Sequence, residues 1–180
     1  MLGLGQSLSS PSFIGDSGFS YSRSVIRSTD GWTLVSVDGS PTLEYNQTAP
    51  DSSTGWMKLT FDTTQTNYFA IQNTSILSGA VVGGSVAVIK HDVYFHNAAL
   101  WGDDSASDDD IIKWQTLYGL GTQVSSVPTD QAVTVTHNVT AINANEQLQF
   151  RNELGGDSGT DYPLANAELY IKNIDIQITY

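Results

Sequence analysis

The chain has no cysteine among its 180 residues, so neither a disulfide framework nor a thiolate metal site can form. Cations are also scarce: 7 Lys and Arg stand against 19 Asp and Glu, which gives a formal charge of 7 − 19 = −12. Binding to a nucleic-acid backbone or an anionic membrane surface requires clustered cations, and the sequence has none. We therefore expect no nucleic-acid partner and no membrane partner.

Long apolar runs are absent too. No stretch approaches the roughly 20 apolar residues that a membrane span needs. Residues 1–8 are partly apolar but lack the basic region and the apolar run of a secretory signal. The sequence therefore predicts a chain without a leader and without a transmembrane segment.

The residues that are present favour strands. Hydrophobic residues make up 39% of the chain and charged residues 14%, and most of the polarity comes from Ser, Thr, Asn, Gln and Gly. Alternating segments bounded by turn signals such as Asp30-Gly31 and Asp38-Gly39 predict strands within residues 32–37, 42–45, 56–62, 68–72, 85–96, 111–118, 132–139, 146–151 and 169–180. Nine or ten strands predict an all-β fold, an antiparallel β-sandwich (jelly roll).

Two of these segments carry more specific predictions. Successive side chains of a strand point to opposite faces of the sheet, so odd and even positions form two phases. The run 85–96 starts with apolar residues in both phases, which predicts a strand covered on both sides. In the last segment, Leu169 and Ile171 share one phase, whereas Ile174 and the residues that alternate with it take the other. The slip at Lys172-Asn173 predicts a β-bulge in a strand that completes the core.

Residues 1–20 are rich in Gly and Ser and are predicted to form an extended N-terminal arm before a sandwich domain at 21–180. Burial of a large apolar side chain contributes about 1.5–3 kcal/mol, so the arm is predicted to be an assembly element. Its candidate docking residues are Leu2, Leu4, Leu8, Phe13 and Ile14.

Three segments together resemble the galactose-binding-like jelly rolls, especially carbohydrate-binding modules. They are Asp30-Gly31-Trp32, the long segment 84–95 and the closing segment 171–176, and the resemblance extends over about residues 30–180. It implies a polysaccharide-binding sandwich that often holds a structural Ca²⁺ near the strand ends. Asp16, Asp30, Asp51 or Asp175 could serve there.

Residues 1–8 resemble the start of small structural proteins of tailed phages, in which a short apolar arm leads into a β domain. That resemblance implies a virion structural protein, used for capsid decoration or as a head-fibre or tail accessory. It also implies location in the virion, the major capsid protein or other virion proteins as partners, and a homo-oligomer with a trimer favoured.

Exposed aromatic side chains would matter most for sugar binding, because a pyranose face stacks on a ring while its hydroxyls need polar partners. Trp101 and Trp114 flank an acidic loop and Tyr118 follows, so these three with Asp103 or Asp108 form the candidate carbohydrate site. A loop anchor or a subunit contact is the alternative for Trp101. By contrast, Trp32 and Trp56 lie in alternating strands and are predicted to be core residues.

The acidic loop itself is a candidate Ca²⁺ site, because Ca²⁺ prefers oxygen ligands. Its carboxylates are those of Asp103, Asp104, Asp108, Asp109 and Asp110. The spacing does not match an EF-hand, and a solvated loop tip held open by charge repulsion is the alternative. Ca²⁺ is the one cofactor that the sequence suggests.

No pattern predicts an enzyme. His91 and His96 lie five apart, so on a strand they face opposite sides, and His137 sits in an apolar alternation as a core or interface residue. Neither a Gly-x-Ser-x-Gly elbow nor a phosphate loop is present. The leading prediction is therefore the non-catalytic phage virion protein. The alternative is a non-catalytic carbohydrate-binding module, and the two are not exclusive.

Overall fold

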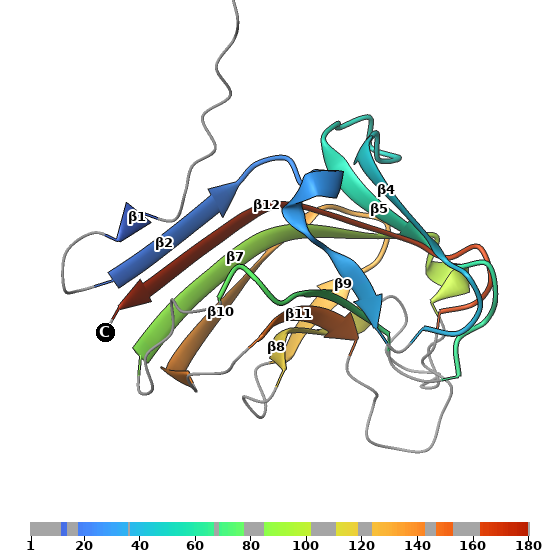
Figure 1. Cartoon of the computed structure of the whole chain (residues 1–180). Coiled ribbons are helices and arrows are strands. Elements are labelled where there is room, and N and C mark those ends of the chain that lie inside the picture. The colour runs from blue at the N-terminus through green and yellow to red at the C-terminus, as the bar shows by residue number, and fades with distance from the viewer. Residues whose placement is uncertain are drawn as a thin grey trace, which may run out of the picture.

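The computed structural model describes residues 12–13, 18–35, 37–66, 69–77, 85–101, 111–118, 124–142, 147–152 and 163–179. Two antiparallel sheets account for this part of the chain, together with two short 3-10 helices, η2 (Ser28–Asp30) and η3 (Ala98–Leu100). Neither helix is long or apolar enough to cross a membrane. The all-β, antiparallel sandwich predicted from the sequence is confirmed (Figure 1).

The larger sheet has seven strands and the smaller one has five. The strands of the larger sheet are β1 (Ser12–Phe13), β2 (Gly18–Arg23), β4 (Thr42–Gln47), β5 (Trp56–Thr60), β7 (Ser85–His96), β10 (Val133–Ile142) and β12 (Glu168–Thr179). Five of them lie in the order β1-β2-β12-β5-β4. The strand β7 pairs with β12 on one side and with β10 on the other. The smaller sheet has the order β3-β6-β11-β8-β9, with β3 (Thr33–Val35), β6 (Ala70–Asn73), β8 (Ile111–Tyr118), β9 (Val124–Pro128) and β11 (Gln147–Asn152).

The strand β12 organises the larger sheet. One of its edges pairs with β7, and the other is divided between β5 at its start and β2 at its end. Leu169 and Ile171 point into the core before an irregularity between Lys172 and Asp175, and Ile174 points inward after it. Asn173 has a positive φ of 52° there. The bulge predicted from the phase slip is confirmed, and the extra residue keeps both apolar runs on the same face.

Asn173 should tolerate glycine better than alanine. A left-handed backbone costs an ordinary L residue about 1–2 kcal/mol, so Asn173→Ala should lower the free energy of unfolding by about 1 kcal/mol. Because glycine adopts this conformation freely, Asn173→Gly should stay within about 0.5 kcal/mol of the parent. Urea unfolding measures both. Equal losses would instead point to the hydrogen bond that the Asn173 amide donates to Asp92.

Several sequence predictions need correction. Residues 18–20 belong to β2 and Phe19 is a core residue, so the sandwich begins before the predicted boundary at residue 20. Neither β1 nor β9 was expected, because the first lies in the predicted arm and the second runs into Pro128-Thr129-Asp130, which is typical of a turn. The outward side chains at the start of β7 are not covered: Val86 is 46% exposed, so the apolar run there reflects β-propensity and not burial on both faces.

Candidate functional site

The two tryptophans predicted to bind sugar are core residues. Trp114 is fully buried, and its ring is nearly parallel to that of Phe150 at a centroid distance of 6.3 Å. Its indole N–H donates to Nε2 of His91 at 2.8 Å. Trp101 is 6% exposed, and its indole N–H donates to the carbonyl oxygen of His96 at 3.0 Å. Neither ring presents a face to a ligand, so the sequence prediction is wrong for both. Of the alternatives for Trp101, the loop anchor fits.

The other predicted ligands cannot be placed as a site. Tyr118 ends β8, but its side chain lies outside the described residues. The acidic loop also lies outside the described residues, with Asp103, Asp104, Asp108, Asp109 and Asp110. So do the arm residues Leu2, Leu4, Leu8 and Ile14. Of Phe13 only the backbone is described, which pairs with Phe19 where β1 lies beside β2.

Within the described ranges, no three His, Asp or Glu side chains come together as a metal site. Three of the four aspartates that the resemblance offered for Ca²⁺ have protein partners, and Asp16 lies outside the described residues. Asp175 accepts from the side-chain amide of Gln177 at 2.9 Å. Asp30 accepts from the backbone N–H of Arg27 at 2.8 Å. Asp51 accepts from the backbone N–H and the hydroxyl of Ser53, and these bonds lower the pKa of Asp51. The calcium prediction therefore gains no support from these residues.

A different set of side chains gathers on the outer face of the larger sheet, where β5, β12 and β7 lie side by side. The register places Tyr170 between Lys58 and Tyr94, and it places Glu168 between Thr60 and His96. These side chains alternate with the inward-facing core residues of the same strands, and so they share the outer face. We call the following set the outer-face patch: Trp56, Lys58, Tyr94, His96, Glu168 and Tyr170.

Three aromatic rings form the centre of the patch. Trp56, Tyr94 and Tyr170 are 0%, 5% and 3% exposed, and with Ala49 they make a small apolar cluster separate from the main core. Tyr170 meets both other rings edge-on, at centroid distances of 6.3 Å to Trp56 and 6.0 Å to Tyr94. Such edge-to-face pairs fix the rings relative to one another.

A loop between β4 and β5 covers one end of this cluster. Ala49 packs on the rings, and the hydroxyl of Ser53 accepts the indole N–H of Trp56 at 2.8 Å. The ammonium of Lys172 lies 4.2 Å from the centroid of the Trp56 ring, a cation–π distance. The faces of the Trp56 ring are therefore covered by the chain itself. The ring presents no face to a ligand and instead packs against Tyr170, which it holds in place.

Glu168 carries the main acceptor of the patch. One carboxylate oxygen accepts from Nζ of Lys58 at 2.6 Å, and the other accepts from the hydroxyl of Tyr170 at 2.7 Å. Burial alone would raise the pKa of Glu168, but these bonds and the charge of Lys58 outweigh it and lower the pKa. Burial, the bond to Glu168 and its charge raise the pKa of Tyr170. At neutral pH the carboxylate is ionised and the phenol is protonated.

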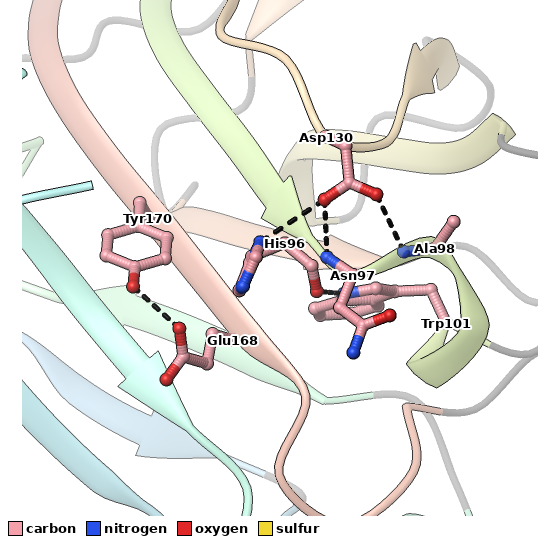
Figure 2. A network of polar contacts seen from close by, with 7 residues as sticks. All are labelled: His96, Asn97, Ala98, Trp101, Asp130, Glu168 and Tyr170. Carbon is pink, nitrogen blue, oxygen red and sulfur yellow. Dashed lines mark hydrogen bonds and ion pairs between the residues drawn. The ribbon is translucent and has the colours of Figure 1, made fainter. Parts of the chain in front are cut away.

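His96 is the most exposed side chain of the patch, and Figure 2 shows its contact with Asp130. Its Nδ1 lies 3.2 Å from Oδ1 of Asp130, and the same oxygen accepts from the backbone N–H of Asn97 at 2.6 Å. The other oxygen, Oδ2, accepts from the backbone N–H of Ala98 at 3.0 Å. Burial raises the pKa of Asp130, but the backbone bonds and His96 lower it overall. Because the ionised carboxylate accepts from Nδ1–H, the ring is held in place and Nε2 remains to meet a ligand.

Exposure increases across the patch from the rings toward His96. The side chains of Lys58 and Glu168 are 19% and 23% exposed, and those of His96 and Asp130 are 38% and 47% exposed. A ligand would therefore contact ionic and hydrogen-bonding groups that a rigid aromatic base holds in position. This combination suits the hydroxyls of a sugar chain.

Sequence reasoning missed this patch, although a signal for it exists. Tyr94 and Tyr170 lie in the outward phase of their strands, together with Asp92, His96 and Glu168. Large aromatic residues in an otherwise polar phase indicate an outer-face cluster.

A scan against models of protein families finds no match, and neither does a search of curated proteins. Among solved structures, the CBM22-1 xylan-binding domain of Xyn10C from Paenibacillus barcinonensis matches with a TM-score of 0.52 and 16% identity, over 88% of this chain and 92% of that chain. The tandem CBM22-1-CBM22-2 domain of the same Xyn10C matches with a TM-score of 0.50 and 15% identity, over 88% of this chain and 45% of that chain.

At these identities the likeness shows the fold, which is the jelly roll of carbohydrate-binding modules, as the sequence resemblance implied. The resemblance of residues 1–8 to phage proteins has no counterpart in these matches. The predicted virion role, virion location, capsid partner and trimer are not supported, and they remain sequence predictions.

Proposed function

We propose that this chain is a non-catalytic carbohydrate-binding module and that the outer-face patch holds its polysaccharide. The observation that carries the proposal is the Glu168 carboxylate, which is fixed by Lys58 and Tyr170 above a rigid aromatic base and beside the accessible His96. Sugar recognition needs polar groups that are held in fixed positions. In the patch the buried rings hold Lys58, Glu168 and His96 in position, and these polar side chains, not the rings, would contact the sugar. The likeness to a xylan-binding domain in fold supports the same reading.

The state of the carboxylates argues for binding without catalysis. A glycosidase needs a carboxylic acid whose pKa is raised, so that it can protonate the leaving oxygen near neutral pH. The pKa values of Glu168 and Asp130 are both lowered by the hydrogen bonds that these residues accept. Both side chains are therefore hydrogen-bond acceptors for a ligand and poor proton donors.

Charge around the patch favours an uncharged ligand. Carboxylates of Asp51, Asp130 and Glu168 act on its tyrosines, while Lys58 is paired with Glu168 and Lys172 lies over Trp56. No cation among these residues is left to compensate a uronate, and the chain carries a net charge of −12. The proposed ligand is therefore a neutral polysaccharide, and xylan is the first probe.

Affinity electrophoresis and titration calorimetry test this proposal, with soluble xylan, neutral glucans and polygalacturonate as ligands. The parent should bind a neutral polymer and not the uronate. His96→Ala and Glu168→Gln should each weaken binding at least tenfold, about 1.4 kcal/mol. The first removes the polar group at the accessible edge, and the second replaces the ionised acceptor by a neutral amide and breaks its ion pair with Lys58. Gln177→Ala is the matched control, since Gln177 is exposed on the same face of β12 away from the patch.

Three outcomes would contradict the proposal. If the parent bound none of these polymers, the carbohydrate function would be wrong. Unchanged affinity in His96→Ala and Glu168→Gln would place the ligand elsewhere on the chain. Release of reducing sugar that Glu168→Gln abolishes would show an enzyme.

A further inference from the structure

The edge strands of the two sheets differ in how they are protected against pairing with another chain. An exposed edge is a template for a further strand, and proteins block it with short strands, bulges, charges or proline. Here β1 has two residues and β3 has three, β4 has a register irregularity after Glu44, and β9 ends at Pro128. These four edges all carry a blocking feature.

The fifth edge strand, β10, has none over most of its length. It has ten residues and pairs with β7 in unbroken register from Val133 to Val139. Among the described residues it has a hydrogen-bonded neighbour strand on that side only. Its outward side chains Thr134, Thr136 and Asn138 are exposed and uncharged, although the chain as a whole carries a net charge of −12.

We propose that β10 pairs antiparallel with β10 of a second copy of this chain, which joins two seven-stranded sheets edge to edge. A two-fold axis at Thr136 sets Thr136 opposite its own copy and Thr134 opposite Asn138, which are pairs of hydroxyl and amide groups that stabilise adjacent strands. The outward side chains of β10 carry no charge, and the residues beside them on β7, Lys90 and Asp92, have opposite charges, with Asp92 accepting from the hydroxyl of Thr134 at 2.7 Å. Two acidic chains therefore meet at this edge without a row of like charges. Pairing through a two-fold axis uses up both edges, so the assembly closes as a dimer.

The dimer would place both outer-face patches on one side of a continuous sheet. Residues directly opposite in an antiparallel ladder point to the same face, so the outer face of one copy continues into that of the other. On the proposed carbohydrate function, which this consequence needs, a long polysaccharide can engage both patches. Its apparent affinity then exceeds that of a short oligosaccharide through effective concentration.

Light scattering over a concentration series tests the pairing without any sugar. The parent should reach twice the chain mass of 19.4 kDa. Thr136→Lys and Thr136→Glu should each be monomeric, since like charges then face each other, and an equimolar mixture of the two should recover the dimer. The added lysine reduces the net negative charge, so general repulsion cannot explain its monomeric state. Gln177→Lys, exposed on β12 with a strand on each side, is the matched control and should stay dimeric.

The absence of native cysteine gives a second measurement. Thr136→Cys should form a disulfide-linked dimer under mild oxidation, and Gln177→Cys should not. A parent that stays monomeric at every concentration, or a Thr136→Lys variant as dimeric as the parent, would overturn the proposal. A dimer that binds no polysaccharide would overturn the carbohydrate function alone and leave the β10 pairing in place.

Discussion

Trp114→Ala is expected to lower the free energy of unfolding by about 3–5 kcal/mol, the loss typical of a buried aromatic side chain. Trp114 is fully buried, and it packs against Phe69, Phe95 and Phe150 between the two sheets. Its removal opens a cavity at the centre of the sandwich and takes away the hydrogen-bond donor to His91. Urea unfolding at pH 8 followed by circular dichroism measures the loss.

Trp114→Phe separates packing from hydrogen bonding. Phenylalanine retains much of the ring volume but leaves Nε2 of His91 without a donor, so the expected loss is about 1–3 kcal/mol. Both variants should bind polysaccharide like the parent at temperatures where they are folded. A Trp114→Ala variant with parental stability and no sugar binding would restore the ligand role that the sequence predicted for this residue.

The second large effect is acid destabilisation through His91. Burial, with a smaller contribution from the charge of His137, lowers the pKa of His91 from 6.5 to about 3. Its Nε2 accepts from Trp114, so a proton there would set two N–H donors against each other. In the unfolded chain His91 takes up a proton near pH 6.5, whereas in the folded chain it stays neutral. Stability is therefore fully present above pH 6.5 and is lost as the pH falls below it.

Linkage gives the size of this loss. One such group reduces the free energy of unfolding by about 1.4 kcal/mol per pH unit, or about 3 kcal/mol between pH 6.5 and pH 4. His137 acts in the same direction, because burial lowers its pKa to about 4. The carboxylates whose pKa values are lowered, such as Glu168, lose their contribution only below their ordinary range near pH 4. The interval from pH 6.5 to pH 5 therefore reports on the histidines.

His91→Gln is the variant that isolates this effect, because the glutamine amide oxygen can still accept from Trp114. Denaturant unfolding in half-unit steps from pH 8 to pH 5 should show little difference from the parent above about pH 7, and below pH 6.5 a slope that is smaller by up to about 1.4 kcal/mol per pH unit. His96→Ala provides the control, since His96 lies on the outer face and not in the core. An unchanged slope in His91→Gln would show that His91 is not the buried neutral group responsible.

The sequence predicted those features of the fold that depend on local pattern. The run of β7 and the bounds of β8 follow from local runs of strand-forming residues, and the bulge of β12 follows from an interrupted alternation. The strands β2 and β9 were missed because Gly18 and Pro128 mark turns in most contexts. Pairing with β12 and β8, which are distant in sequence, draws these segments into sheets.

The candidate site could not be found in the same way, because it depends on register between distant strands. Nothing local to Tyr94 indicates that Tyr170 lies beside it, and only the pairing of β7 with β12 brings the two rings together. Trp101 and Trp114 failed as site residues for a related reason. Nearness to an acidic loop in sequence says little about exposure, and both indoles satisfy their N–H groups inside the sandwich.

The central position of β12 also constrains when this sandwich can form during synthesis. On the ribosome, β2, β5 and β7 emerge long before β12, the strand that all three pair with. Until then their inner edges have no neighbour, and contacts this far apart in sequence form slowly. We expect the nascent chain to depend on protection from aggregation until β12 has emerged, and the larger sheet to form in one cooperative step after that.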